Sequence, residues 1–77
     1  MTLIDRIRDC GRLAVQELRT GHADQAHRYL AERDGLESAL EGRYNNVFAE
    51  PRLRQAYEQG WEDGNKLKQL EAVGLLG

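Results

Sequence analysis

The sequence predicts an all-α protein, in which an antiparallel helical hairpin packs with a third helix. Apolar residues recur at helical spacing in three segments, about residues 3–20, 23–41 and 51–72, and no segment alternates as a half-buried strand does. The short connection "TGHAD" places the first two helices side by side and antiparallel. We therefore expect the 77 residues to form one small helical domain, residues 1–77.

The first predicted helix has the most regular amphipathic pattern. Thr2 is a suitable N-cap, and Asp5 places an acid in the first turn. Gly21 after Thr20 can adopt the left-handed conformation that ends a helix. At 100° per residue one side of this helix is apolar, and it consists of Leu3, Ile4, Ile7, Cys10, Gly11, Ala14, Val15 and Leu18.

The second predicted helix ends at Gly42, and its apolar residues form a single arc: Ala23, Ala26, Tyr29, Leu30, Leu36, Leu40 and Tyr44. In the loop that follows, Val47 and Phe48 are expected to tuck under the chain as an apolar plug. Pro51 suits the first turn of the third helix, where a missing N–H group costs nothing. After this helix, residues 73–77 are expected to form a frayed or docking tail.

A chain of 77 residues builds a thin core, so we expect it to form a homodimer. Arg33 and Glu37 lie within the apolar arc beside Leu36 and Leu40, and a buried charge needs a partner. One interpretation is that these four residues form an oligomer interface, where the polar pair fixes the register. The other is that the arc is half buried, with both charged side chains reaching solvent.

Composition argues against several classes of function. The net charge of −2, with both signs interleaved, lacks the basic stripe of a general nucleic-acid binder. Neither a signal peptide nor a membrane span is evident, so the sequence predicts a cytoplasmic protein without membrane contact. Cys10 is the only cysteine and is expected in the core, while His22 and His27 point about 140° apart. We therefore expect no cofactor, no metal and no catalytic site.

The third helix raises the main question of function, because Gly60 and Gly64 lie one turn apart on its apolar face beside Tyr57 and Trp61. Glycine inside a helix costs roughly 0.5–1 kcal/mol relative to alanine. A compensating contact is close approach of another backbone. That backbone belongs either to the same chain or to a partner, and a small-molecule pocket is a third alternative.

The segment Ala56-x3-Gly60-Trp61-x2-Gly64 resembles a segment of the ribosome modulation factor family. The resemblance covers nine residues, and it implies a factor associated with ribosomes or RNA. The whole chain, small, helical and rich in interleaved charge, is also similar in style to phage and mobile-element accessory proteins. Many of those proteins bind and block a component of the host cell.

The sequence therefore predicts a non-enzymatic regulator or inhibitor, phage-encoded, that docks on a host protein. Aromatic and arginine side chains dominate interface energetics, and they assign the partner surface to Tyr57, Gly60, Trp61, Gly64, Arg52 and Arg54. One alternative is a ribosome- or RNA-associated modulation factor. Another is an oligomeric protein that sequesters a small anionic, nucleotide-like ligand between its helices.

Overall fold

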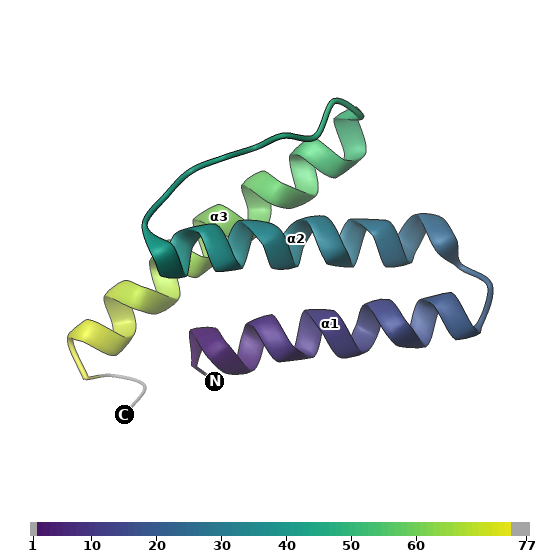
Figure 1. Ribbon diagram of the computed structural model, residues 1–77. Helices are drawn as coiled ribbons and strands as arrows, with labels where there is room; N and C mark the ends of the chain where they lie inside the picture. The colour runs from purple at the N-terminus through teal and green to yellow at the C-terminus, as the bar shows by residue number, and fades with distance from the viewer. Residues whose placement is uncertain (1, 75–77) are drawn as a thin grey trace.

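The computed structural model describes residues 2–74 and confirms an all-α fold of three helices. Helix α1 spans Leu3–Arg19, α2 spans Ala23–Glu41 and α3 spans Pro51–Ala72. Figure 1 shows α1 and α2 as an antiparallel hairpin, with α3 crossing α2. Helix α2 lies in the middle and packs against both neighbours, whereas α1 and α3 hardly touch. Residues 75–77, part of the predicted tail, lie outside the described residues.

The helices begin and end at residues whose local chemistry explains the boundaries. The Thr2 hydroxyl accepts a hydrogen bond from the Asp5 N–H, and the Asp5 carboxylate accepts one from the Thr2 N–H, which completes a capping box. Gly42 ends α2 with a positive φ of 73°. At the start of α3 the Glu50 carboxylate accepts hydrogen bonds from two backbone N–H groups. None of the described helices has an apolar stretch long enough to cross a bilayer.

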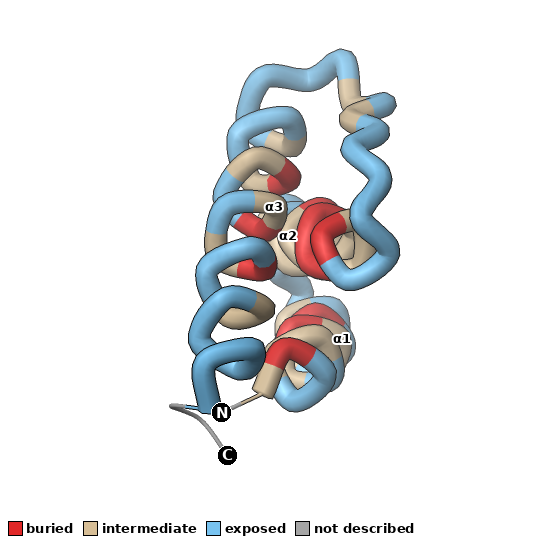
Figure 2. Tube along the Cα trace, turned by 90° about the vertical axis from the view of Figure 1, so that its left-hand side faces the viewer, coloured by how far each residue is buried: buried red, intermediate tan, exposed pale blue. Residues whose placement is uncertain are grey.

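The buried core is small and rich in alanine, and α2 contributes to it on two sides. Leu36 packs with Leu3 and Cys10 of α1, while Gly35 faces α3. Figure 2 shows the buried segments of α1 and α3 turned toward α2 between them. The prediction of a single apolar arc on α2 was therefore wrong, because a central helix buries two faces. Tyr44 lies in the loop after α2.

Helices α2 and α3 approach so closely that their backbones touch. A Cβ atom placed on Gly35 would overlap the carbonyl oxygen of Tyr57, and one placed on Gly60 would overlap that of Glu32. A Cβ atom on Gly64 would lie 2.6 Å from the Ala39 Cβ atom. Any side chain at these positions would push the helices apart, so glycine is required by contact rather than by conformation. The groove of α3 is thus filled by α2 of the same chain.

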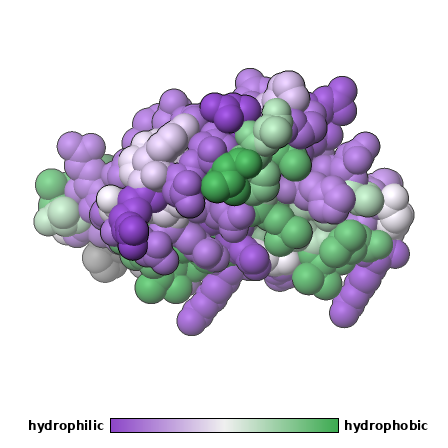
Figure 3. All heavy atoms as spheres, turned by 45° about the horizontal axis from the view of Figure 1, so that its top comes forward, coloured by the Kyte–Doolittle hydropathy of each residue, from purple (hydrophilic) through white to green (hydrophobic). Residues whose placement is uncertain are grey.

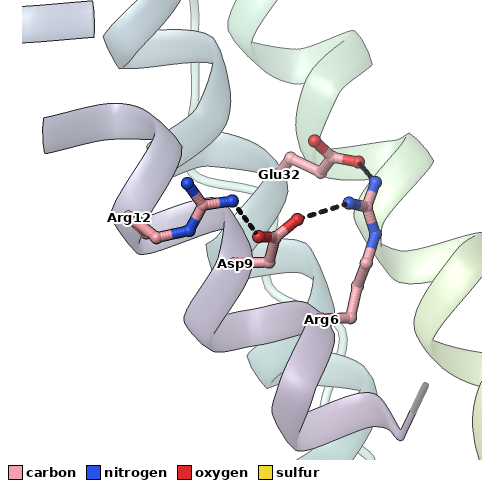
Figure 4. Close-up of polar contacts among 4 residues, drawn as sticks. All are labelled: Arg6, Asp9, Arg12 and Glu32. Carbon is pink, nitrogen blue, oxygen red and sulfur yellow. Dashed lines mark hydrogen bonds and ion pairs between the residues drawn. The ribbon is translucent and has the colours of Figure 1, made fainter. Parts of the chain in front are cut away.

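Polar contacts join the helices around this core. Figure 4 shows Arg6 bridging two helices, because its guanidinium reaches Glu32 of α2 at 2.9 Å and Asp9 of α1 at 3.9 Å. Asp9 also pairs with Arg12, at 2.6 Å. The Arg6–Glu32 pair is largely covered, with 29% and 15% of the side chains exposed, so water screens it less than a surface pair. It helps to fix the hairpin.

Candidate functional site

The candidate site lies along residues 42–50, which connect α2 to α3 and are called the strap below. Figure 1 shows the strap running from the end of α2 back over that helix to the start of α3. Val47 is 72% exposed and Tyr44 is 51% exposed. Phe48 is half-buried and packs against Tyr57, with ring centroids 6.1 Å apart. The predicted plug is therefore correct for Phe48 and wrong for Val47, which points to solvent.

Tyr57 anchors the strap from below. Its ring is only 1% exposed, and its hydroxyl is fully used. The hydroxyl donates a hydrogen bond to the Ser38 hydroxyl at 2.6 Å and accepts one from the Asn45 backbone N–H at 2.7 Å. A single side chain of α3 thus joins α2, α3 and the strap.

A second set of contacts holds the strap to the outer side of α3. The Tyr44 ring meets Tyr57 and Trp61 edge-on, with centroids 5.6 Å and 5.2 Å apart, and its hydroxyl donates to the Glu58 carboxylate. The Asn46 amide also donates to Glu58, at 3.1 Å. These contacts order an exposed loop, so its apolar side chains are presented in one arrangement.

The Arg54 guanidinium closes the far end of the strap by donating to the Phe48 carbonyl at 3.1 Å. The same residue's carbonyl accepts a hydrogen bond from the Asn46 amide at 3.2 Å. Arg54 was predicted to bind a partner. In the structure its guanidinium binds the strap itself.

The strap contacts predict a loss of stability in acid. Hydrogen bonds from Tyr44 and then from Asn46 lower the pKa of Glu58 below its usual value of 4.5. Because the folded pKa is depressed, the stabilisation is present above 4.5 and is lost as pH falls through the lower, folded pKa. Below that pKa, where Glu58 of the wild type is protonated, we expect Glu58→Gln to have nearly the same free energy of unfolding as the wild type. Near neutral pH we expect the variant to be less stable than the wild type. Urea unfolding at both pH values measures this difference, and a constant gap at all pH values would contradict it.

Beneath the strap lies a cavity with a volume of about 680 Å³. Three carboxylates from α2, those of Asp34, Glu37 and Glu41, line it together with Arg43. Burial raises the pKa of Asp34, as expected where a carboxylate is partly removed from water. Tyr44, Val47 and Phe48 line the strap side. The cavity therefore combines negative charge with an apolar rim.

The structure separates the residues that were predicted to bind a partner. Tyr57, Gly60 and Gly64 are buried within the chain and are corrected to structural roles. Trp61 is half-buried under Tyr44, and Arg52 is exposed at the first turn of α3. Trp61, Arg52 and Arg54 therefore keep surface for a partner, although the Arg54 guanidinium also binds the strap.

The predicted oligomer interface is also divided. Leu36 is fully buried inside the chain, so its assignment to an interface was wrong. Leu40 is exposed, and Arg33 pairs with Glu37 at 3.5 Å on a half-exposed side of α2. These three residues remain on the surface.

Sequence reasoning missed Val47 as a surface residue and the acidic lining of the cavity. The signal for the lining was present, since Asp34, Glu37 and Glu41 recur at three- and four-residue spacing on one side of α2. No comparable signal in the sequence predicts that Val47 is exposed, because an apolar residue in a loop can point either to the core or to solvent.

Comparison of the chain with protein-family models, curated proteins and solved structures found no match. Among residues 2–74, no three His, Cys, Asp or Glu side chains are arranged to hold a metal ion. Cys10 is buried, and burial followed by the charge of Glu32 raises its thiol pKa to about 11. A thiol in that state is a poor nucleophile.

Proposed function

We propose that this chain is a non-enzymatic regulator or inhibitor, acting in the cytoplasm, that docks on another protein through the strap. The observation that carries the proposal is the ordered exposure of Tyr44 and Val47 above the cavity. Exposed apolar residues on a fixed loop lose little conformational entropy when they bind. Tyr44 also belongs to the residue types that carry much of the binding energy at interfaces.

The charges around the cavity specify the chemistry of the partner. Asp34, Glu37 and Glu41 outnumber Arg43, so a basic side chain flanked by apolar groups fits the cavity better than an anion does. This feature favours a protein partner with an exposed lysine or arginine over a nucleotide-like ligand. In this proposal the chain is a phage-encoded inhibitor, and its partner is a host protein that carries such a basic side chain.

The expected result is that Val47→Lys strongly reduces capture of a partner protein. The immobilised chain is incubated with a bacterial lysate, the retained protein is identified, and its affinity is then measured with purified components. We expect Val47→Lys to weaken that affinity at least about tenfold, about 1.4 kcal/mol, because it places a charge in the apolar rim and repels a basic partner. Glu41→Gln should lower mainly the association rate, with a smaller dependence on salt.

Arg52→Ala is the matched control, because it changes an exposed residue at the start of the same helix outside the strap. It should leave the affinity unchanged. Loss of binding in Arg52→Ala with full binding by Val47→Lys would reject the strap and favour the arginines as the contact. Retention of ribosomes that weakens steeply with salt would instead support the ribosome-associated alternative.

A further inference from the structure

The strap presents backbone groups to solvent along one side. Residues 43–49 form no helix, strand or turn, and within residues 2–74 the strap residues 44–49 make no hydrogen bond between backbone groups. Side chains bind only the N–H groups of Asn45 and Phe48 and the carbonyl of Phe48. An exposed stretch of chain with unpaired backbone groups is a template for pairing with another extended chain.

The contacts of the strap with α3 show that its first half is extended. The side chains of Tyr44 and Asn46 both reach the Glu58 carboxylate, and side chains two residues apart share one face in an extended chain. The N–H group of Asn45, between them, donates to the Tyr57 hydroxyl. Because the backbone groups of neighbouring residues point to opposite sides of an extended chain, those of Tyr44 and Asn46 point away from Tyr57. We call the N–H and carbonyl groups of Tyr44 and Asn46 the free edge.

The surroundings of the free edge specify the side chains of an incoming segment. Val47, which is 72% exposed, offers an apolar contact beside it. Figure 3, in which the strap side of the molecule is turned toward the viewer, shows hydrophobic atoms bordered by hydrophilic ones. Three carboxylates and one arginine line the cavity beneath the strap. The free edge therefore lies between an apolar contact and an acidic cavity.

We propose that the partner binds as an extended segment that adds a strand to the free edge, with an arginine or lysine side chain in the acidic cavity and apolar side chains beside Val47. This inference rests on the proposed docking through the strap and adds the form of the partner. Backbone hydrogen bonds to Tyr44 and Asn46 supply affinity, and the cavity supplies specificity. The carboxylates of the cavity would repel an acidic segment. A helix laid on the free edge would leave its backbone groups without hydrogen-bond partners.

The probe is a synthetic pentapeptide, acetyl-TVRVT-amide, which combines high strand propensity with one central arginine. It should bind the full chain with a dissociation constant of about 1 mM or tighter, measured by NMR shifts of the strap amides. In the complex, exchange of the Tyr44 and Asn46 amides with water should slow, while the Asn45 amide, already bonded to Tyr57, should change little. No binding at about 5 mM peptide would overturn the proposal, as would unchanged exchange at both amides in the complex.

Methylation of peptide nitrogens separates backbone pairing from side-chain contact. Only alternate nitrogens of a paired segment face the strap. One peptide carries an N-methyl group at the arginine, and the other carries N-methyl groups at the two valines. One of them should bind at least about tenfold more weakly than the parent peptide, and the other should bind nearly as tightly. Equal loss or equal retention of binding in the two peptides would reject strand pairing.

The charge of the segment is tested by replacing the arginine. The peptide acetyl-TVEVT-amide should bind at least about tenfold more weakly than the arginine peptide, and Glu41→Gln should reduce the difference between the two. Equal binding of both peptides by the wild-type chain would reject a basic segment.

Asn46→Pro and Asn46→Ala are a matched pair within the chain. Both remove the side-chain contact with Glu58, but only proline also removes the backbone N–H of the free edge, and its fixed φ is compatible with an extended chain. Asn46→Pro should bind the arginine peptide at least about fivefold more weakly than Asn46→Ala, with circular dichroism as the check that both are folded. Equal binding by the two folded variants would contradict pairing at Asn46.

The docking proposal and the extended segment fail in different ways. If Val47→Lys loses the protein retained from the lysate and the peptide does not pair with the strap, docking stands and the extended segment is overturned. If the peptide pairs with the free edge and Val47→Lys still binds the retained protein fully, docking of that protein through the strap is rejected, while the strap remains a peptide-binding site.

Discussion

Gly60→Ala is expected to destabilise the protein by at least about 3 kcal/mol, although alanine is the better helix former. The added Cβ atom would overlap the carbonyl oxygen of Glu32, which belongs to the backbone of α2 and cannot rotate away. Relief requires the two helices to separate along their whole contact. Urea unfolding followed by circular dichroism measures the loss.

The size of the effect should follow the atom that the new methyl group meets. Gly35→Ala should resemble Gly60→Ala, because it also meets backbone, at Tyr57. Gly64→Ala should cost less, since its neighbour is the Ala39 Cβ atom at 2.6 Å. Asn65→Ala, an exposed change next to Gly64, is the control and should alter stability by less than about 0.5 kcal/mol. Equal effects in all four variants would contradict the close contact.

Tyr57→Ala should be the other large loss, about 3–5 kcal/mol, because it empties the space beneath the strap and removes two hydrogen bonds. Tyr57→Phe separates the two contributions. It keeps the ring and leaves the Ser38 hydroxyl and the Asn45 N–H without their partner, which should cost about 1–3 kcal/mol. Chemical unfolding of both variants measures how much the ring and how much the hydrogen bonds of Tyr57 stabilise the protein.

Hydrogen exchange supplies a local readout for the same residue. In Tyr57→Phe the Asn45 amide loses the oxygen to which it donates, so its exchange should become faster while α1 amides are less affected. Tyr44→Phe is the control, because its exposed hydroxyl donates to Glu58 and the hydrogen bond from Asn45 to Tyr57 stays intact. Unchanged Asn45 exchange in Tyr57→Phe would mean that Tyr57 does not hold the strap.

The helix boundaries were predictable because each depends on local chemistry. Thr2 caps the start of α1, Gly42 ends α2 with a positive φ, and Pro51 begins α3 with its fixed φ. The structure places all three at the predicted helix ends. The first helix ends at Arg19 rather than residue 20 because Thr20 is the C-cap. None of these helix ends depends on a contact with a distant part of the chain.

The packing of α2 was not predictable by the same reasoning, because it depends on what lies on each side. A helix between two others has no single apolar face, so its pattern looks weakly amphipathic. The sequence did contain the relevant signal, since Ala31, Gly35 and Ala39 repeat every four residues, as Ala56, Gly60 and Gly64 do on α3. Recognising that the two rows match would have predicted that α2 of the same chain fills the groove of α3.

The most direct test is an NMR measurement of the nuclear Overhauser effect between the Gly60 α protons and the Leu36 amide proton. The sample contains a mixture of labelled and unlabelled chains, so that contacts within a chain are distinguished from contacts between chains. The Leu36 nitrogen lies 3.0 Å from the position of a Cβ atom on Gly60, so a strong nuclear Overhauser effect is expected within one chain. The effect should be absent from the spectrum filtered for contacts between chains. Its appearance only between chains, or its absence from both spectra, would contradict the packing of α2 on α3 described above.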